Sequence, residues 1–167
     1  MTAEAPVLHV LHPGDVAVVG RGERLETVLG SCVAILLTDR LRTVGAMCHI
    51  VHAAPPARPV DCPTAHGDGA LSAMFALLRR RAIEPRLCRA WVYGGGHMFP
   101  GGIGPQADEG HVGAINARWA LQALAAEGIA VQAAELGGHA WRRLAWTVGP
   151  GDPELQVMPV YGPGELS

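Results

Sequence analysis

Charged side chains are scarce in this sequence. Asp, Glu, Lys and Arg make up 17% of the 167 residues, against about 25% in an average globular protein. The formal net charge is only -2, so the chain lacks the excess of positive charge that binds nucleic acid or an anionic membrane surface. Binding to nucleic acid is therefore not expected.

Long apolar runs are lacking too, and the first residues do not predict a secretory leader. No run approaches the roughly 20 apolar residues that a membrane-spanning helix needs, and the first six residues include no Lys or Arg. The four cysteines (Cys32, Cys48, Cys62 and Cys88) do not form the disulfide framework of a small secreted domain. We expect a cytoplasmic protein with reduced thiols and no membrane insertion.

Metal and nucleotide motifs are missing as well. The eight histidines form no H-E-x-x-H motif, and the cysteines form no C-x-x-C pair. His49 and His52 are three residues apart, a spacing that points two side chains to opposite faces of a strand. Gly94, Gly95 and Gly96 follow an apolar run but match neither common phosphate-binding loop, so we interpret them as tightly packed backbone. We expect no metal ion and no cofactor.

Hydrophobic residues are plentiful, at 49% of the chain, which is enough to bury the core of a single domain spanning residues 1–167. Apolar runs predict strands, helical spacing predicts two helices, and the Pro-, Ala- and His-rich stretch 53–68 predicts a loop. Strands are expected at 33–38, 43–51, 87–93, 129–136, 144–148 and 155–160, and helices at 69–81 and 114–127. This order favours a layered α/β or α+β domain and not a helix bundle.

Two of these strands predict a hairpin that brings a cysteine and a histidine together. Only four residues separate 33–38 from 43–51, a common loop length. If Thr38 faces Thr43, the same register places Cys32 opposite His49. Opposed residues have Cβ atoms about 4.5–5.5 Å apart and side chains on one face, within reach of a thiol–imidazole hydrogen bond. Cys48 would then point to the other face and belong to the core.

A cysteine beside a histidine suits nucleophilic catalysis, because the imidazole can take the thiol proton. Cys32 would be the nucleophile, with a lowered pKa, and His49 the base. Gly30 and Ser31 precede Cys32, and a glycine there permits a turn whose N–H groups face a developing oxyanion. Thr27 is near enough in sequence to orient the base. The alternative is structural, since buried cysteines and satisfied core histidines are common.

Two segments carry a family resemblance. Residues 27–34 (Thr-Val-Leu-Gly-Ser-Cys-Val-Ala) and 45–49 (Gly-Ala-Met-Cys-His) resemble the signature of the CheD family, the chemoreceptor glutamine deamidases of bacterial and archaeal chemotaxis. Weaker elements lie at 12–15, 93–99, 112–116 and 137–142, so the resemblance covers about residues 10–150. It implies a layered α/β sandwich of mixed sheets with flanking helices, related to the glutamine-deamidating toxins. It also implies a catalytic set of Cys32, His49 and a preceding threonine, here Thr27.

The activity implied by this resemblance is hydrolysis of particular receptor glutamine amides to glutamate through a thioester on Cys32. The implied partners are the cytoplasmic helices of methyl-accepting chemotaxis proteins and a CheC-type phosphatase. One alternative is a non-catalytic adaptor for that phosphatase, and another is a cysteine hydrolase of small amides. We expect a shallow site flanked by Arg42 and the loop 53–68, which suits a glutamine on a helix better than a free metabolite.

The sequence departs from the family pattern at the rim of the expected site. Residues 50–55 differ from the usual segment after the histidine. Glu135 and Trp141 stand where the family has aspartate and glycine. These differences bear on substrate choice and partner contacts, because the cysteine and histidine themselves are intact.

Overall fold

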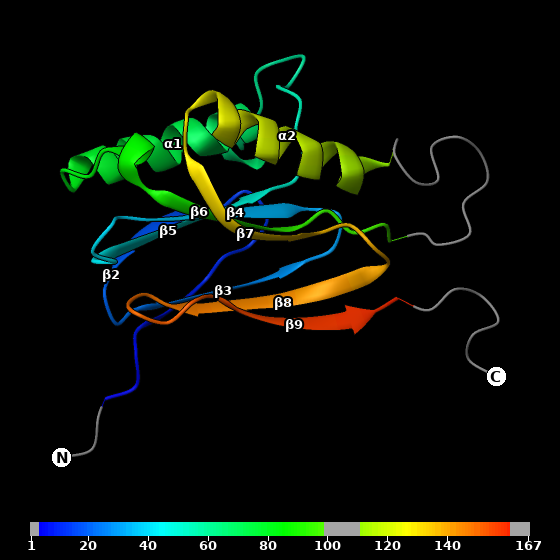
Figure 1. Ribbon diagram of the computed structural model, residues 1–167. Coiled ribbons are helices and arrows are strands. Elements are labelled where there is room, and N and C mark those ends of the chain that lie inside the picture. Colours follow the sequence, from blue (N-terminus) through cyan, green and yellow to red (C-terminus); the bar gives the residue numbers. More distant parts are fainter. Residues whose placement is uncertain (1–3, 99–110, 161–167) are drawn as a thin grey trace.

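The two central strands, β4 (Val33–Thr38) and β5 (Val44–Ile50), are buried at every position. Strands that read as continuous apolar runs are typically covered on both faces, and a computed structural model describing residues 4–98 and 111–160 has this arrangement. Figure 1 shows two helices over one face of the sheet that contains β4, and a second sheet under its other face. The chain is therefore an α+β sandwich of three layers, which confirms the predicted fold class.

The described strands form two sheets. The five-stranded sheet has the order β2-β5-β4-β6-β7, antiparallel except for the β6–β7 pair. The four-stranded sheet has the order β1-β3-β8-β9, antiparallel except for the β1–β3 pair. The remaining elements are β1 (Leu8–Val10), β2 (Val16–Gly20), β3 (Arg24–Leu29), α1 (Gly67–Arg80), β6 (Arg89–Gly94), α2 (Val112–Ala126), β7 (Ala130–Leu136), β8 (Ala140–Thr147) and β9 (Glu154–Pro159), with short 3-10 turns at Pro63–Ala65 and Pro85–Leu87.

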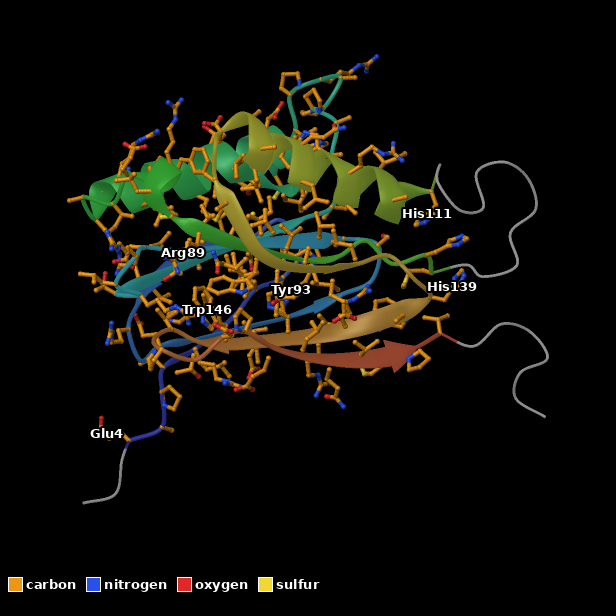
Figure 2. All side chains as sticks on the ribbon, in the orientation of Figure 1. Glu4, Arg89, Tyr93, His111, His139 and Trp146 are labelled. Atoms are coloured by element: carbon orange, nitrogen blue, oxygen red, sulfur yellow. The ribbon has the colours of Figure 1, made fainter. Side chains whose placement is uncertain are left out.

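Alternate residues of β4 face two separate cores, as the two-residue period of a strand requires. Val33 and Ile35 pack under the helices. Ala34 and Leu36 face the four-stranded sheet. Figure 2 shows Tyr93 and Trp146 between the two sheets, where they belong to this second core. Neither helix in the described part of the chain has the length and apolarity needed to cross a bilayer.

The predicted helices and most predicted strands are confirmed, with ends shifted by a few residues. Three short strands, β1, β2 and β3, were not predicted, and β8 begins four residues earlier than expected. In β3 the outward positions carry Arg24, Glu26 and Val28 while the inward positions are buried. Such a one-sided strand is a weak sequence signal, because only three of its residues face the core.

The predicted hairpin exists, but its register is wrong by two residues. Thr38 pairs with Gly45 and not with Thr43. The cause is Asp39, whose carboxylate accepts hydrogen bonds from the N–H groups of Thr43 (2.7 Å) and Val44 (3.0 Å). These two N–H groups are turned into the loop, so the ladder begins later. A shift of two residues preserves which face each side chain occupies.

Candidate active site

Cys32 lies immediately before β4, at the end of the strand remote from the hairpin loop. It is half-buried and packs against the core between the two sheets. β4 is the middle strand of its sheet, so Cys32 lies at the end of a central strand and not at the edge of the sheet. Arg42, expected beside the site, is at the opposite end of β4, where it pairs with Asp152 (2.9 Å).

His49 lies on β5 opposite Ala34, not opposite Cys32 as the sequence analysis expected. Its side chain is 2% exposed and faces the four-stranded sheet, as its hydrogen bond to Thr27 shows. Continuing the ladder makes Cys32 a diagonal neighbour of His49, and diagonal neighbours on one face are about 7–8 Å apart, within reach of long side chains. Among the described residues no hydrogen bond joins the Cys32 thiol to the imidazole, so the resting site holds the two groups near each other but unbonded.

Thr27 comes from β3 in the other sheet and meets His49 between the layers. The Thr27 hydroxyl is 2.8 Å from His49 Nδ1 and 2.8 Å from the carbonyl oxygen of Leu11. A carbonyl oxygen can only accept, so the single hydroxyl proton goes to Leu11. His49 Nδ1–H must therefore donate to the Thr27 oxygen, which leaves Nε2 unprotonated. This tautomer is the one in which an imidazole can accept a proton through Nε2.

Burial keeps both candidate reacting groups neutral at rest. It lowers the pKa of His49 to about 4, with Asp15 opposing and His12 reinforcing this effect. Burial also raises the pKa of the Cys32 thiol, partly offset by the residue's own N–H. The lowered thiol pKa expected from the sequence is therefore wrong for the resting site. The geometry suits a neutral base that removes the thiol proton during reaction, not a preformed ion pair.

The segment 30–32 is fixed by the backbone that follows β6. Gly96 N–H donates to the Gly30 carbonyl and Gly95 N–H donates to the Cys32 carbonyl, each at 2.9 Å. Gly94 has φ +114°, and a Cβ there would lie 2.2 Å from the Cys32 oxygen. Gly94, Gly95 and Gly96 are thus tightly packed backbone, as expected, and the close approach requires glycine.

The N–H groups of Ser31 and Cys32 remain available for a ligand. In the described part of the chain, neither donates to a backbone or side-chain acceptor beyond the short contact of Cys32 N–H with its own sulfur. Gly30 is covered by the ring of Trp141, which would lie 2.8 Å from a Cβ at that position. Unpaired N–H groups beside a nucleophile can bind an oxyanion. Gly30 and Ser31 stay candidates for shaping such a site.

A cavity of about 400 Å³ reaches the base from the side of β1 and β3. It is lined by Leu11, Thr27 and His49 together with outer residues such as His12 and Arg143. Cys32 is not among its lining residues. The cavity therefore gives solvent access to the Thr27–His49 pair, and it is not a closed pocket around the nucleophile of the kind that encloses a small free amide.

The end of the expected loop 53–68 packs beside the base. Ala65 accepts a hydrogen bond from Val51 N–H (2.8 Å), and Thr64 donates to the Gly14 carbonyl. Gly14 N–H in turn donates to the His49 carbonyl (2.9 Å). The end of this loop therefore supports the strand that carries the base.

Two buried polar residues near the nucleophile were not among the predicted catalytic or oxyanion residues. Arg142 on β8 is 3% exposed and donates to the carbonyls of Gly94 (3.2 Å) and Gly137 (2.7 Å), with Glu135 at 3.6 Å from its Nε. Asn116 on α2 is 1% exposed and bonds to the nucleophile segment. The glycines before Arg142 and the predicted helix start near Asn116 could be recognised in the sequence. Neither feature indicated which residues Arg142 and Asn116 would contact.

Three histidine rings gather at the end of the molecule where Figure 2 shows His111 and His139. His97 stacks on His111 at 4.4 Å between centroids and lies 5.0 Å from His139. His111 also caps α2, because its Nδ1 accepts from Ala114 N–H. Within residues 4–98 and 111–160 no group of three or more His, Cys, Asp or Glu is arranged to hold a metal ion. The three rings pack against one another as an aromatic cluster.

Comparison with known proteins gives a consistent result. A family model described as CheD chemotactic sensory transduction matches residues 53–156, more than half of the chain. A protein of Albidiferax ferrireducens named "Probable chemoreceptor glutamine deamidase CheD 2" is 35% identical over 160 residues, which cover 93% of this chain and 90% of its own. A Geobacter sulfurreducens protein of the same name is 35% identical over 158 residues, covering 93% and 94%. These similarities extend over nearly the whole chain, which therefore belongs to the CheD family.

Proposed function

We propose that this chain deamidates glutamine side chains of chemoreceptors, with Cys32 as nucleophile, His49 as general base and Thr27 as the residue that orients the base. The observation that carries this proposal is the hydrogen-bonded series Leu11–Thr27–His49, which leaves His49 Nε2 free to accept a proton. The proposed substrate segment is a glutamine-bearing helix in the cytoplasmic part of a methyl-accepting chemotaxis protein, and the proposed location is the cytoplasm.

The proposed reaction uses the protein's own side chains and backbone N–H groups, together with water. His49 Nε2 takes the Cys32 proton, and the sulfur attacks the carboxamide carbon of the glutamine. The oxyanion lies near the N–H groups of Ser31 and Cys32. His49 returns the proton to the leaving nitrogen, ammonia departs, and a glutamyl thioester remains. His49 then activates water, which hydrolyses the thioester to glutamate and regenerates the thiol.

The product carries one more negative charge than the substrate. A new carboxylate on a receptor helix changes the local electrostatics and so shifts the balance between signalling states. A glutamyl methyl ester could react by the same steps, with methanol as the leaving group.

The test is incubation of the chain with receptor cytoplasmic domains, followed by peptide mass spectrometry to find glutamine-to-glutamate conversion. Cys32→Ala should abolish conversion and His49→Gln should nearly abolish it. Cys62→Ala, which removes an exposed thiol, is the matched control and should retain full activity. Efficient hydrolysis of free glutamine with every receptor glutamine unchanged would overturn the proposed substrate.

A second candidate function is that of an adaptor that binds a CheC-type phosphatase without catalysis. The free Nε2 of His49 on the sheet face shared with Cys32 favours the enzyme, since an adaptor has no use for an oriented base. The two functions are compatible, and they separate experimentally: Cys32→Ala should lose deamidation while retaining any binding of the phosphatase.

A further inference from the structure

Asn116 on α2 is a buried polar residue without a part in the chemistry described so far. Its Nδ2 donates two hydrogen bonds, one to the Ser31 carbonyl at 3.1 Å and one to the Val51 carbonyl at 2.9 Å. A primary amide nitrogen carries two hydrogens, so a single atom can bind both carbonyls. Asn116 therefore ties together the segment that precedes the nucleophile and the segment that follows the base.

Among the described residues, no other hydrogen bond joins the segment just before β4 to the segment just after β5. The β4–β5 ladder ends with the pair Val33 and Ile50. Cys32 is just beyond that last pair, and His49 is just inside it. Strand ends without ladder bonds open most easily, and Asn116 spans this open end.

The bond to Ser31 also fixes a peptide plane that matters for the chemistry. The Ser31 carbonyl and the Cys32 N–H belong to the same planar, trans peptide group. Holding the carbonyl on one side therefore aims the N–H to the other side. The neighbouring carbonyls of Gly30 and Cys32 are held by backbone N–H groups, so Ser31 is the position in this segment that relies on a side chain.

The position of Asn116 is itself well defined. It lies one turn from Gly113, where a Cβ would approach the Gly96 oxygen to 2.4 Å and the Gly95 oxygen to 2.5 Å. The start of α2 is thus in backbone contact with the same glycine segment that binds Gly30 and Cys32. The helix and the nucleophile segment form one packed unit.

We infer that Asn116 is a positioning residue, which holds the Cys32 thiol and N–H in register with His49. This inference rests on the proposed function. Losing the two donors should let Ser31 and Val51 separate or rotate, and small displacements of reacting groups cost about a hundredfold in rate. The loss should appear in kcat, because Asn116 is only 1% exposed and acts through the backbone of Ser31 and Val51.

The test uses Asn116→Ala, which removes the donors by shortening the side chain, and Asn116→Asp, which keeps the shape but has no N–H. Gln122→Ala removes an exposed amide from the same helix and is the matched control. Kinetics with a receptor substrate should show kcat lowered at least about tenfold with KM unchanged in the Asn116 variants. Thermal unfolding identifies which of the two Asn116 variants is folded, and one folded variant is enough for the kinetic comparison.

A second readout does not need the receptor. The rate of Cys32 alkylation by iodoacetamide is measured with His49 and with His49→Gln, first in the wild type and then in each Asn116 variant. The ratio of the alkylation rate with His49 to the rate with His49→Gln measures how far the imidazole activates the thiol. We expect this ratio to exceed one in the wild type and to fall toward one in the Asn116 variants, because the effects of coupled residues are non-additive. A general structural role would leave that ratio unchanged.

The outcomes separate the inference from the proposed function. If receptors are not deamidated by wild type, but the His49-dependent ratio still collapses in the Asn116 variants, the function is wrong and the positioning role stands. If a folded Asn116 variant keeps wild-type kcat, or keeps the ratio, the positioning role is overturned. A ratio of one in the wild type itself would also overturn it.

Discussion

Acidification should destabilise the folded chain through His49, whose imidazole is buried between the two sheets. Its pKa falls from 6.5 to about 4 on folding. Between these values the unfolded chain binds the proton more readily than the folded chain, so lowering the pH favours unfolding. The loss begins as the pH falls through 6.5 and is complete below about 4. For these two pKa values the linkage relation gives a loss of about 2 kcal/mol between pH 7 and pH 5.

The assay is urea unfolding at pH 7 and pH 5, with the difference in unfolding free energy taken for each variant. His49→Gln removes the titrating group, so its difference should be smaller than that of wild type by about 2 kcal/mol. His52→Gln removes an exposed imidazole three residues away and should retain the wild-type difference. Carboxylates that titrate in this range contribute equally to all three proteins and cancel in the comparison.

Equal pH dependence in wild type and His49→Gln would refute the reasoning. It would mean that His49 takes up a proton in the folded chain as readily as in the unfolded one. The pH dependence of the unfolding free energy would then not support the neutral imidazole inferred from the Thr27 hydrogen bond. A preformed thiolate–imidazolium pair would become the better description of the site.

Three further predictions concern the nucleophile and its supports. Thr27→Val should lower kcat about tenfold to a hundredfold because the imidazole loses its orienting partner, whereas Thr27→Ser should stay close to wild type in the same deamidation assay. Because burial raises the pKa of Cys32, its alkylation measured by mass spectrometry should slow about tenfold per pH unit toward neutrality; fast labelling at pH 6 would contradict this. Gly94→Ala should destabilise the fold by about 2 kcal/mol or more in urea unfolding, since its Cβ would strike the Cys32 carbonyl, while Gly151→Ala enters open space and should be silent.

The candidate pair could be found from the sequence even though the register was wrong. The loop count missed the side chain of Asp39, which binds two backbone N–H groups and lengthens the loop. Because strand side chains alternate with period two, an error of two residues leaves Cys32 and His49 on one face. An error of one residue would have placed them on opposite faces. The prediction that they share a face therefore holds because the register error is an even number of residues, and not because the assumed turn is correct.

The pKa of Cys32 could not be predicted from the pair alone. A nearby imidazole lowers a thiol pKa only if it carries a charge or hydrogen bonds to the sulfur. Here His49 is deeply buried and is itself kept neutral, so desolvation decides the direction for both groups. The burial of both groups depends on how the four-stranded sheet covers the hairpin. β3 and β8 form most of this cover. Their outward-facing polar residues make them hard to recognise as strands from the sequence.

Long-range contacts account for the other part of the site that sequence could not supply. Thr27 was proposed for its closeness to Cys32 in sequence, yet it reaches His49 across the space between two sheets, on a strand that was not predicted. Asn116 lies 85 residues from Ser31 and 65 from Val51. The local hairpin brings nucleophile and base near each other, but the tautomer of the base and the direction of the Cys32 N–H are set by residues from β3 and α2. Reactivity in this site therefore requires all three layers to be assembled, which predicts that loss of His49-dependent Cys32 alkylation and global unfolding should coincide in a denaturant titration.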